Sequence, residues 1–377
     1  MLLMGRQLTI DEELDFLRAA IKIEAPSWKE KEVVALLDTI FEGTPARISI
    51  DDVGNFIATS GSGNPIILLS SHMDTIDQPL PFKEDGDWIT GRGAVDCRPS
   101  LLAMALATRR MITKGHPGTI IFSGIVAEEV STAGIEHFLN DSLKPSCAIF
   151  GEPTALKICI AYKGRAWFEI SVLAKPGHVA AAWIHVNGID VMHELKEKIA
   201  YNLAELIKHK KLSPFYTPRA ILTTMETDNI PNMLPRKVRA DLDIRFPPTI
   251  PKETIGSIVE IARKEIEAKH RVRDDTLSIE TRTMSLINGV RVSTKSRLCK
   301  DLTAAIEKVT KQKSILVKKT GTTFMNHIAE YHDIPIVTFG PGDPALEHGD
   351  AERISKSKFL QAVLILENFL ENRLRDL

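Results

Sequence analysis

The sequence contains few cysteines, and they follow no pattern. The four cysteines lie far apart, at positions 97, 147, 159 and 299, without a C-x-x-C pair. A disulfide framework and a thiolate zinc site both need more closely organised cysteines, so neither is expected. Any metal ion in this protein must therefore be held by histidines and carboxylates.

Long apolar runs and an excess of either charge are also absent. No run approaches the roughly 18 apolar residues that span a bilayer, and the apolar residues 1–4 are too few for the core of a signal peptide. We therefore expect a cytoplasmic protein that does not bind membranes. The 48 lysines and arginines nearly balance the 49 aspartates and glutamates, with no basic stripe, so nucleic acid is not an expected partner.

The composition that is present is that of an ordinary globular protein. Hydrophobic residues make up 44% of the 377 residues and charged residues 26%, which is typical of folded domains. A single hydrophobic core seldom grows beyond about 250 to 300 residues. We therefore predict that the chain divides into two domains.

Several short segments are continuously apolar, as expected of strands that are buried on both faces. These segments are residues 66–71, 119–127, 147–150 and 334–339. Segments with helical periodicity precede them or lie between them, at residues 11–41, 99–113, 132–139 and 296–310. The alternation of strands and helices predicts an α/β domain with a mixed sheet that helices cover on both faces.

The pattern changes between residues 162 and 285. Longer strands of alternating polarity and two amphipathic helices are expected there. The strands are predicted at 166–173, 220–226, 239–245 and 277–283, and the helices near 187–210 and 251–270. We therefore predict an α+β domain, residues 162–285, inserted into the first domain. Residues 1–161 and 286–377 would then form one discontinuous domain.

Residues that can bind metal ions follow each of the four apolar segments. In chain order they are His72 and Asp74, then Glu128 and Glu129, then Glu152, and finally His348, while Asp96 lies in a glycine-containing turn at residues 91–96. Open α/β sheets place their sites beyond the carboxyl ends of strands, so these side chains should meet. Each residue alone also fits a structural role, such as a helix cap, but their joint placement favours a site. Imidazoles and carboxylates suit a pair of zinc or similar ions.

The same residues give the sequence a resemblance to the M20 family of di-zinc metallohydrolases. The resemblance rests on His72-x-Asp74-Thr75, Gly91-Arg92-Gly93-Ala94-x-Asp96, Glu128-Glu129, Gly151-Glu152-Pro153-Thr154 and His348. Residues 162–164, 319–326 and 340–348 are most similar to the archaeal-type N-acetyl-lysine/N-acetyl-ornithine deacetylases. Some members of that group act on amino acids that are attached to a small carrier protein.

The resemblance implies a centre of two metal ions, zinc or cobalt, in each chain. Asp96 would bridge the two ions. His72 and Glu152 would complete one metal site, and Glu129 and His348 would complete the other.

Two further residues of these motifs would act without binding metal. Asp74 would hold the second ring nitrogen of His72, as a ligating imidazole requires. Glu128, next to the ligand Glu129, is the natural general base: it would take a proton from the attacking water and return it to the leaving amine.

The inserted domain carries further matches to the family, which imply that it is a lid and dimerisation domain. His178 resembles the lid histidine, which in related enzymes reaches the active site of the partner subunit and would stabilise the oxyanion. His185 lies nearby and is an alternative to His178. By the same resemblance, a homodimer is expected, and the substrate-binding residues would be Asn232, Arg245, Gly321 and Thr322.

Two departures from the family pattern concern the substrate pocket. The chain reads Cys97-Arg98-Pro99 after Asp96, where members of the family usually continue with Lys-Gly after one residue. Phe324 replaces the usual acidic residue. The missing carboxylate removes one charge that could recognise a cationic side chain.

The resemblance implies an amidohydrolase that removes an N-acyl group from a small basic amino acid in lysine or arginine biosynthesis. Alternatives with the same ligands are a succinyl-diaminopimelate desuccinylase and an M20 dipeptidase or carboxypeptidase. A catalytically inactive, metal-stabilised binding protein is a further alternative, against which the presence of Glu128 argues. Residues 158–285 have a net charge of +4 and the rest of the chain −5, a bias that would attract an acidic carrier but that solvated helix faces also explain.

Overall fold

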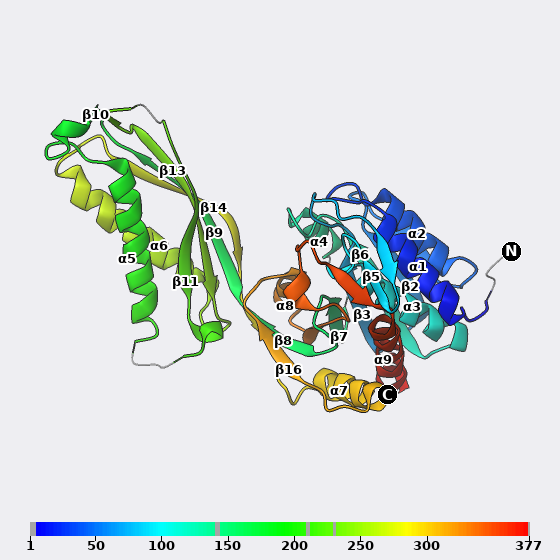
Figure 1. Cartoon of the computed structure of the whole chain (residues 1–377). Coiled ribbons are helices and arrows are strands. Elements are labelled where there is room, and N and C mark those ends of the chain that lie inside the picture. Colours follow the sequence, from blue (N-terminus) through cyan, green and yellow to red (C-terminus); the bar gives the residue numbers. More distant parts are fainter. Residues whose placement is uncertain (1–4, 140–143, 209–211, 229–230, 376–377) are drawn as a thin grey trace. The chain divides into compact units, whose positions relative to one another are not determined.

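The computed structural model describes residues 5–139, 144–208, 212–228 and 231–375 (Figure 1). The apolar residues 1–4 and the predicted helix end at residues 209–210 lie outside these ranges. The chain forms two compact units. Unit 1 comprises Met1–Ile160, Val292–Val317 and Thr323–Leu377, and unit 2 comprises Ala161–Arg291 and Lys318–Thr322. Within the described ranges, no helix is both long enough and apolar enough to cross a membrane.

The largest sheet, which lies at the centre of unit 1, is mixed. Its strands follow the order β1 (Arg47–Ile50), β2 (Phe56–Ser62), β6 (Gly118–Ile125), β3 (Ile66–His72), β7 (Cys147–Gly151), β17 (Ile336–Phe339), β8 (Ile158–Tyr162) and β15 (Val290–Arg291), and β16 (Leu316–Lys319) also pairs with β8. The strands β6, β3, β7 and β17 run parallel, whereas β1, β2 and β8 run antiparallel to their neighbours. The predicted α/β fold with a mixed sheet is therefore confirmed, and the four apolar segments are its parallel strands.

Helices of unit 1 pack against this sheet and against one another. They are α1 (Ile10–Lys22), α2 (Lys31–Phe41), α3 (Arg98–Lys114), α4 (Ala133–Phe138), α7 (Arg297–Thr310), α8 (Phe324–His332) and α9 (Lys356–Arg375). α3 contacts β3, β6 and β7 and is flanked by α1, α2 and α9. α1 begins at a capping box, in which the Thr9 hydroxyl accepts from the Glu12 N–H and the Glu12 carboxylate accepts from the Thr9 N–H. The sequence patterns did not predict α8 and α9.

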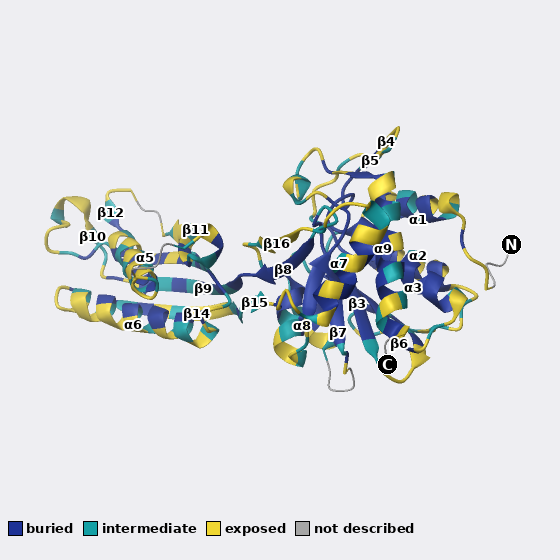
Figure 2. Ribbon diagram, turned by 90° about the horizontal axis from the view of Figure 1, so that it is seen from below, coloured by how far each residue is buried: buried dark blue, intermediate teal, exposed yellow. Residues whose placement is uncertain are grey.

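The central strands and α3 form the core of unit 1 (Figure 2). Every residue of β6, β7 and β8 is buried, which explains why these strands lack a polar face in the sequence. α3 is buried from Arg98 to Ile112. A small antiparallel sheet in the order β18 (Arg353–Ser355), β5 (Trp88–Thr90), β4 (Lys83–Asp85) lies beside the turn that carries Asp96, and the short 3-10 helix η3 (Pro344–Leu346) precedes His348.

Unit 2 has a different architecture and a core of its own. Its main sheet is antiparallel in the order β11 (Arg219–Thr227), β13 (Lys237–Phe246), β9 (Gly164–Leu173), β14 (Ser278–Ile287). Buried and partly exposed residues alternate along β9 and β13, because only one sheet face is packed under α5 (Gly188–Glu205) and α6 (Lys252–Arg271). A ribbon of β10 (Gly177–His178) and β12 (Met233–Leu234) and the 3-10 helices η1 (Val179–Ala181) and η2 (Pro214–Tyr216) complete the unit.

Candidate metal centre

The carboxyl ends of the parallel strands carry most of the predicted site residues. β3 ends at His72, Glu128 and Glu129 lie just beyond β6, and Glu152 follows β7 directly. His348 lies beyond β17, after η3. Because β6, β3, β7 and β17 are neighbours that run in the same direction, their carboxyl ends share one edge of the sheet.

Asp96 contacts two histidines through its two carboxylate oxygens. Nε2 of His72 lies 3.1 Å from Oδ1 of Asp96, and Nε2 of His348 lies 3.2 Å from Oδ2. His348 Nε2 also lies 3.0 Å from Oε1 of Glu129. The potential ligand atoms thus form two groups, each with all atoms within 4.8 Å of one another: His72, Asp96 and Cys97, and Asp96, Glu129 and His348. Asp96 belongs to both groups, so its two oxygens would be available to two metal ions.

The turn that carries Asp96 requires a glycine at position 93. Gly93 has a φ of +78°, and a Cβ there would lie 2.9 Å from Cγ2 of Thr75 and 3.0 Å from Cγ of Arg98. Glycine tolerates this backbone conformation and has no Cβ to clash. The glycine that marks the turn in the sequence therefore lets the turn approach the segment that follows His72.

Asp74 holds three parts of the centre together. It is fully buried, and its Oδ1 lies 3.2 Å from Nδ1 of His72, which leaves Nε2 of that ring directed at Asp96. The same carboxylate accepts the backbone N–H groups of Glu128 at 3.0 Å and Glu129 at 3.1 Å, and the hydroxyl of Ser27 at 2.6 Å. Asp74 therefore fixes the ring of His72 and the backbone of the Glu128-Glu129 pair together, which goes beyond the role that the sequence suggested.

Hydrogen bonds between the histidines and carboxylates shift their pKa values in opposite directions. Burial raises the pKa of Asp96, but hydrogen bonds from His348 and His72 outweigh burial and hold that pKa far below its ordinary value. Hydrogen bonds to Asp96 and Glu129 raise the pKa of His348 to about 10. Burial lowers the pKa of His72, yet interactions with Cys97, Asp74 and Asp96 raise it well above its ordinary value. In the metal-free protein these imidazoles therefore act as the cations of the centre.

The environment of Glu128 differs from that of the other carboxylates. Burial raises the pKa of Glu128 well above its ordinary value; His72 opposes this effect, while Glu152 and Glu129 add to it. Its backbone is held by Asp74, and its side chain belongs to neither group of potential ligand atoms. A carboxylate with a raised pKa that is not itself a ligand can accept and return a proton near neutral pH.

Glu152 lies at the centre but outside these two groups. Its Oε1 accepts the hydroxyl of Thr323, the N-cap of α8, at 2.8 Å, and its charge raises the pKa values of Cys97 and Glu128. The sulfur of Cys97 takes the third position beside His72 and Asp96. Burial raises the pKa of the Cys97 thiol to about 12, and a thiol must be deprotonated to bind a metal. Among the described residues, Cys97 and not Glu152 is grouped with His72 and Asp96, whereas Glu152 is the ligand that the resemblance implies.

The residues at this edge fit a pair of divalent metal ions. The donors are imidazole nitrogens and carboxylate oxygens, which zinc and cobalt accept. Carboxylates outnumber imidazoles here, since Asp74, Asp96, Glu128, Glu129 and Glu152 share the edge with His72 and His348. Bound cations would offset the repulsion among these carboxylates.

Two buried carboxylates at this edge were not identified from the sequence. Glu30 accepts the N–H of Ala127, directly before Glu128, at 2.9 Å. Glu352 accepts the N–H groups of Val95 and Asp96 at 2.8 and 3.1 Å. Both bind backbone groups that are far away in sequence, so no local motif marks them, although Glu352 follows His348 by only four residues.

Unit 2 places its predicted residues in two separate groups. His178 is exposed and pairs with Met233 in the β10–β12 ribbon, and the carbonyl of Asn232 accepts the N–H of Val179 at 3.2 Å, so His178 and Asn232 are neighbours. The alternative His185 lies under this ribbon, where a Cβ on Gly177 would meet its ring.

The second group lies at the opposite end of the main sheet of unit 2. Arg245 pairs with Asp243 and donates to the hydroxyl of Thr322 at 3.1 Å, and that hydroxyl donates to the carbonyl of Lys163 at 2.9 Å. Gly321 is exposed and precedes Thr322. Arg245 is near the last residue of β13, whereas the β10–β12 ribbon is near its first. Unit 2 by itself therefore does not bring His178 and Arg245 together.

The two departures from the family pattern are buried in unit 1. Phe324 is 3% exposed and packs edge to face against Phe150 and His327, so it is a core residue at the start of α8. Arg98 is fully buried and donates to the carbonyl of Ala20 at 2.7 Å, while its Nε and Nη2 have no hydrogen-bond partner among the described residues.

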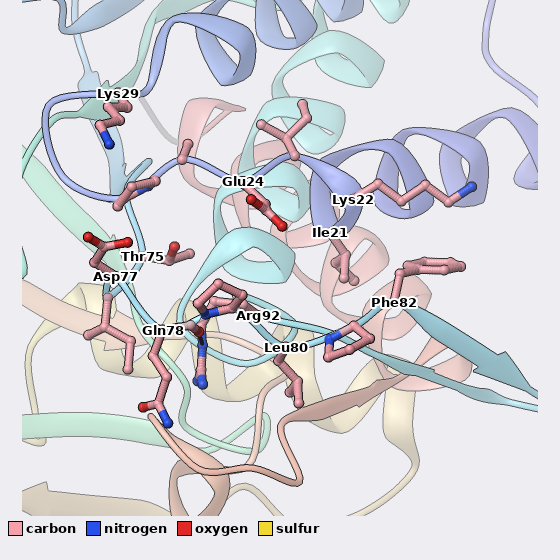
Figure 3. Close-up of a pocket in the computed structure, with 16 residues that line it drawn as sticks. Ile21, Lys22, Glu24, Lys29, Thr75, Asp77, Gln78, Leu80, Phe82 and Arg92 are labelled. Atoms are coloured by element: carbon pink, nitrogen blue, oxygen red, sulfur yellow. Dashed lines mark hydrogen bonds between the residues drawn. The ribbon is translucent and has the colours of Figure 1, made fainter.

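A cavity of about 280 Å³ adjoins the metal centre without containing it (Figure 3). It is lined by residues 21–26, 29 and 75–82 and by Arg92. None of the predicted metal ligands lines it. Thr75 and Arg92 connect the cavity to the segments that carry His72 and Asp96.

An α/β sheet that gathers imidazoles and carboxylates at the carboxyl edge of its parallel strands fits the class of metal-dependent hydrolases. Comparison with known families agrees with this class. Residues 68–372 match peptidase family M20/M25/M40. The chain belongs to this family and is a hydrolase of amide bonds.

Similar proteins match nearly the whole length of the chain. A putative [LysW]-lysine/[LysW]-ornithine hydrolase of Pyrobaculum aerophilum is 30% identical over 341 residues, which cover 90% of this chain and 91% of that protein. The [LysW]-lysine/[LysW]-ornithine hydrolase of Saccharolobus solfataricus is 28% identical, with 94% of each chain covered.

Solved structures show the same fold at lower sequence identity. Aminopeptidase PepT of Bacillus cereus has a TM-score of 0.80 at 17% identity and covers 98% of this chain and 100% of its own. The M20 family metallo-carboxypeptidase Sso-CP2 of Sulfolobus solfataricus has a TM-score of 0.75 at 18% identity, and the match covers 96% of this chain and 99% of that protein. At such identities the likeness supports the fold alone.

Proposed function

We propose that this hydrolase uses two metal ions to release lysine or ornithine from an N-acyl group that a small acidic carrier protein bears. The observation that carries the proposal is the Asp96 carboxylate, whose two oxygens face His72 and His348. Two similar proteins, from P. aerophilum and S. solfataricus, support the substrate class, because their names specify LysW-linked lysine and ornithine.

Five residues would hold two zinc or cobalt ions. Asp96 would be shared, His72 and Glu152 would complete one site, and Glu129 and His348 the other. When bound, the ions would supply Lewis acidity to the scissile amide.

The proton transfers would be carried out by Glu128. Its carboxylate would take a proton from the attacking water and give it to the departing amine, a role that its raised pKa supports. Asp74 would keep Glu128 in place through the backbone N–H and would keep Nε2 of His72 directed at the metal.

Unit 2 would act as a lid and as the surface of a homodimer. Nδ1 of His178 accepts the N–H of Ala180 at 3.1 Å, so the neutral ring carries its proton on Nε2. That N–H is the donor that oxyanion stabilisation needs. Asn232, Arg245, Gly321 and Thr322 would contact the substrate.

A basic cluster in unit 2 supports an acidic carrier as the partner. The cluster, defined as Lys163, Arg219, Arg245, Arg291 and Lys318, lies around η2. Arg291 and Lys318 donate to the hydroxyl of Tyr216 at 3.0 and 3.2 Å, and Lys163 donates to the carbonyl of Thr217 at 2.7 Å. Burial lowers the pKa of Lys163 to about 8, and the charges of Arg219 and Arg245 add to this effect. Such a concentration of positive charge attracts anionic partners.

A substrate panel tests this proposal. The enzyme, loaded with zinc or cobalt, is offered lysine and ornithine linked to an acidic carrier, N-acetyl-lysine, N-acetyl-ornithine, N-succinyl-diaminopimelate and dipeptides, and amine release is measured. We expect the highest kcat/KM for the carrier-linked substrates. Faster cleavage of dipeptides or of N-succinyl-diaminopimelate would contradict the proposed substrate class. A protein that binds two metals but cleaves no substrate of the panel would favour a binding role.

A further inference from the structure

Glu352 makes an unusual number of contacts with the turn that carries Asp96. Its side chain is 1% exposed. One carboxylate oxygen accepts the N–H groups of Val95 and Asp96, at 2.8 and 3.1 Å, and the other accepts Nη1 of Arg92 at 2.7 Å. The backbone carbonyl of Glu352 accepts the N–H of Gly91 at 3.2 Å. The residue therefore binds both ends of the six-residue turn.

The small sheet of unit 1 explains how a residue from the end of the chain reaches this turn. β18 begins directly after Glu352, β5 ends directly before Gly91, and Arg353 pairs with Thr90. This register places Glu352 opposite the turn. The position of its carboxylate is therefore set by the backbone and not by a flexible side chain alone.

Arg92 connects the same carboxylate to the segment of His348. Besides the bond to Glu352, its Nη1 lies 3.4 Å from the carbonyl of Gly349, and its Nε donates to the carbonyl of Gln78 at 2.6 Å. Figure 3 shows Arg92 beside Gln78 at the wall of the cavity. Arg92 and Glu352 thus tie the segment after His348 to the turn of Asp96 and to the loop after Asp74.

We infer that Glu352 is a positioning residue for the bridging carboxylate. By holding the N–H of Asp96 and of its predecessor, it sets where the Asp96 oxygens stand between His72 and His348. Asp74 acts on the backbone of Glu128 and Glu129 in the same way. The inference rests on the proposed two-metal centre, because the distance that Glu352 controls matters only if both Asp96 oxygens bind metal.

Glu352→Gln tests the inference, since an amide has the size of the carboxylate but only one oxygen. Its NH2 group must face either Arg92 or the two backbone N–H groups, so a donor meets a donor and one set of contacts is lost. Partners that orient metal ligands commonly change metal affinity by about 10- to 100-fold. In chelator competition, we expect the folded variant to bind the more weakly held of its two metal ions about 10- to 100-fold less tightly than the wild type does. We also expect kcat to fall while KM changes little.

Glu13→Gln is the matched control. Glu13 is also fully buried and pairs with an arginine, Arg110, at 2.7 and 2.8 Å, within the same unit but without a contact to the centre. This control should lower the melting temperature of the metal-free protein yet leave both metal affinities unchanged. Comparing the two variants at a temperature where both are folded separates positioning from general stability.

Arg92→Lys provides a second variant that keeps a cation beside Glu352. The single ammonium of lysine cannot reach Glu352, Gly349 and Gln78 together as the guanidinium does, so a smaller loss of affinity for the same metal is expected. Two metals bound with wild-type affinity and wild-type kcat in either folded variant would overturn the inference while leaving the proposed centre intact. If the wild-type protein itself binds no metal, the proposed centre and the inference both fail.

Discussion

In unit 1, the candidate catalytic residues gather beyond the carboxyl ends of parallel strands. The Asp96 carboxylate lies 3.1 Å from His72 and 3.2 Å from His348; His72 and Asp96 are buried, whereas His348 is exposed. In unit 2, the candidates lie on an exposed ribbon and at the far end of an antiparallel sheet. One unit therefore has a centre that its own backbone assembles. The candidates of the other unit form two groups that lie apart from one another within that unit.

The difference has an energetic basis. Buried carboxylates repel one another and lose hydration, so unit 1 must hold them with backbone N–H groups and imidazoles. Asp74 and Glu352 are held in this way, since they accept the backbone N–H groups of Glu128 and Asp96. His178 is exposed and does not carry this cost.

The largest expected effect is on the buried side of this comparison. Glu128→Gln should lower kcat by about 100- to 10,000-fold, because an amide cannot accept the proton of the attacking water. Both metals should remain bound, since Glu128 is not one of the five proposed ligands. Turnover of carrier-linked lysine and metal content of the same sample would be measured together.

The exposed Glu136 of α4 supplies the control for this change. Glu136→Gln makes the same substitution in the same unit and should leave kcat unaffected. A Glu128→Gln enzyme that keeps both metals and turns over at the wild-type rate would remove Glu128 from the mechanism.

More of the candidate site in unit 1 than in unit 2 could be predicted from the sequence, and the reason is physical. Parallel neighbours bring their carboxyl ends to one edge, so apolar runs followed by His72, Glu129 and Glu152 were enough to predict convergence. No comparable rule relates the ends of an antiparallel sheet to a site. The separation of His178 from Arg245 could therefore not be predicted from alternating strands.

The supporting contacts of unit 1 escaped prediction. Glu352 acts on residues 256 and 257 positions away, and Thr323 acts on Glu152 across 171 positions. These bonds depend on the register of β18 with β5 and on where α8 begins. Such details are set by tertiary packing, and a single sequence does not encode them in any local pattern.

A smaller effect is expected on the exposed side. His178→Ala should lower kcat by about 100- to 1,000-fold with little change in KM, because an oxyanion donor acts when charge develops in the transition state. His185→Ala is the matched control, and it should leave kcat near the wild-type value. If His185→Ala lowers kcat and His178→Ala does not, His185 and not His178 is the oxyanion donor.

Subunit mixing sharpens this test, because the proposed donor acts in the partner subunit. Inactive Glu128→Gln and inactive His178→Ala chains should regain part of the activity when they form heterodimers. No recovery, once subunit exchange has been demonstrated with labelled chains, would contradict action across the dimer.

Metal binding should depend on pH because the raised pKa values of His72 and His348 keep these two imidazoles protonated in the metal-free protein. His348 has a pKa of about 10 there, raised by Asp96 and Glu129, and only a neutral imidazole binds metal. Below about pH 10, metal must therefore displace this proton, so affinity should rise about tenfold per pH unit, or roughly 100-fold between about pH 6 and about pH 8. Calorimetry in buffers of different ionisation enthalpy would count the protons.

His348→Ala provides the comparison for the pH dependence. This variant should release one proton fewer, and its remaining metal should show a shallower dependence on pH. Equal proton release from the wild type and the variant would show that His348 is neutral before metal binds, against the geometry of its contacts.

The smallest effect concerns the basic cluster of unit 2 and the carrier. Raising the salt concentration from about 0.1 M to about 1 M shortens the Debye length from about 10 Å to about 3 Å. If the cluster steers an acidic carrier, kcat/KM for carrier-linked lysine should fall about tenfold, whereas free N-acetyl-lysine should respond little.

Charge removal within the cluster identifies the residues responsible for this salt effect. Arg291→Gln with Lys318→Gln removes two exposed charges beside η2, while Lys313→Gln with Lys358→Gln removes two exposed charges from unit 1. Only the first pair should lower kcat/KM for the carrier-linked substrate and flatten its dependence on salt, since steering depends on where the charges lie and not on the net charge alone. Equal, weak effects of both pairs would mean that the positive charge of unit 2 is solvated surface, and the assignment of an acidic carrier would then have to rest on the relatives by themselves.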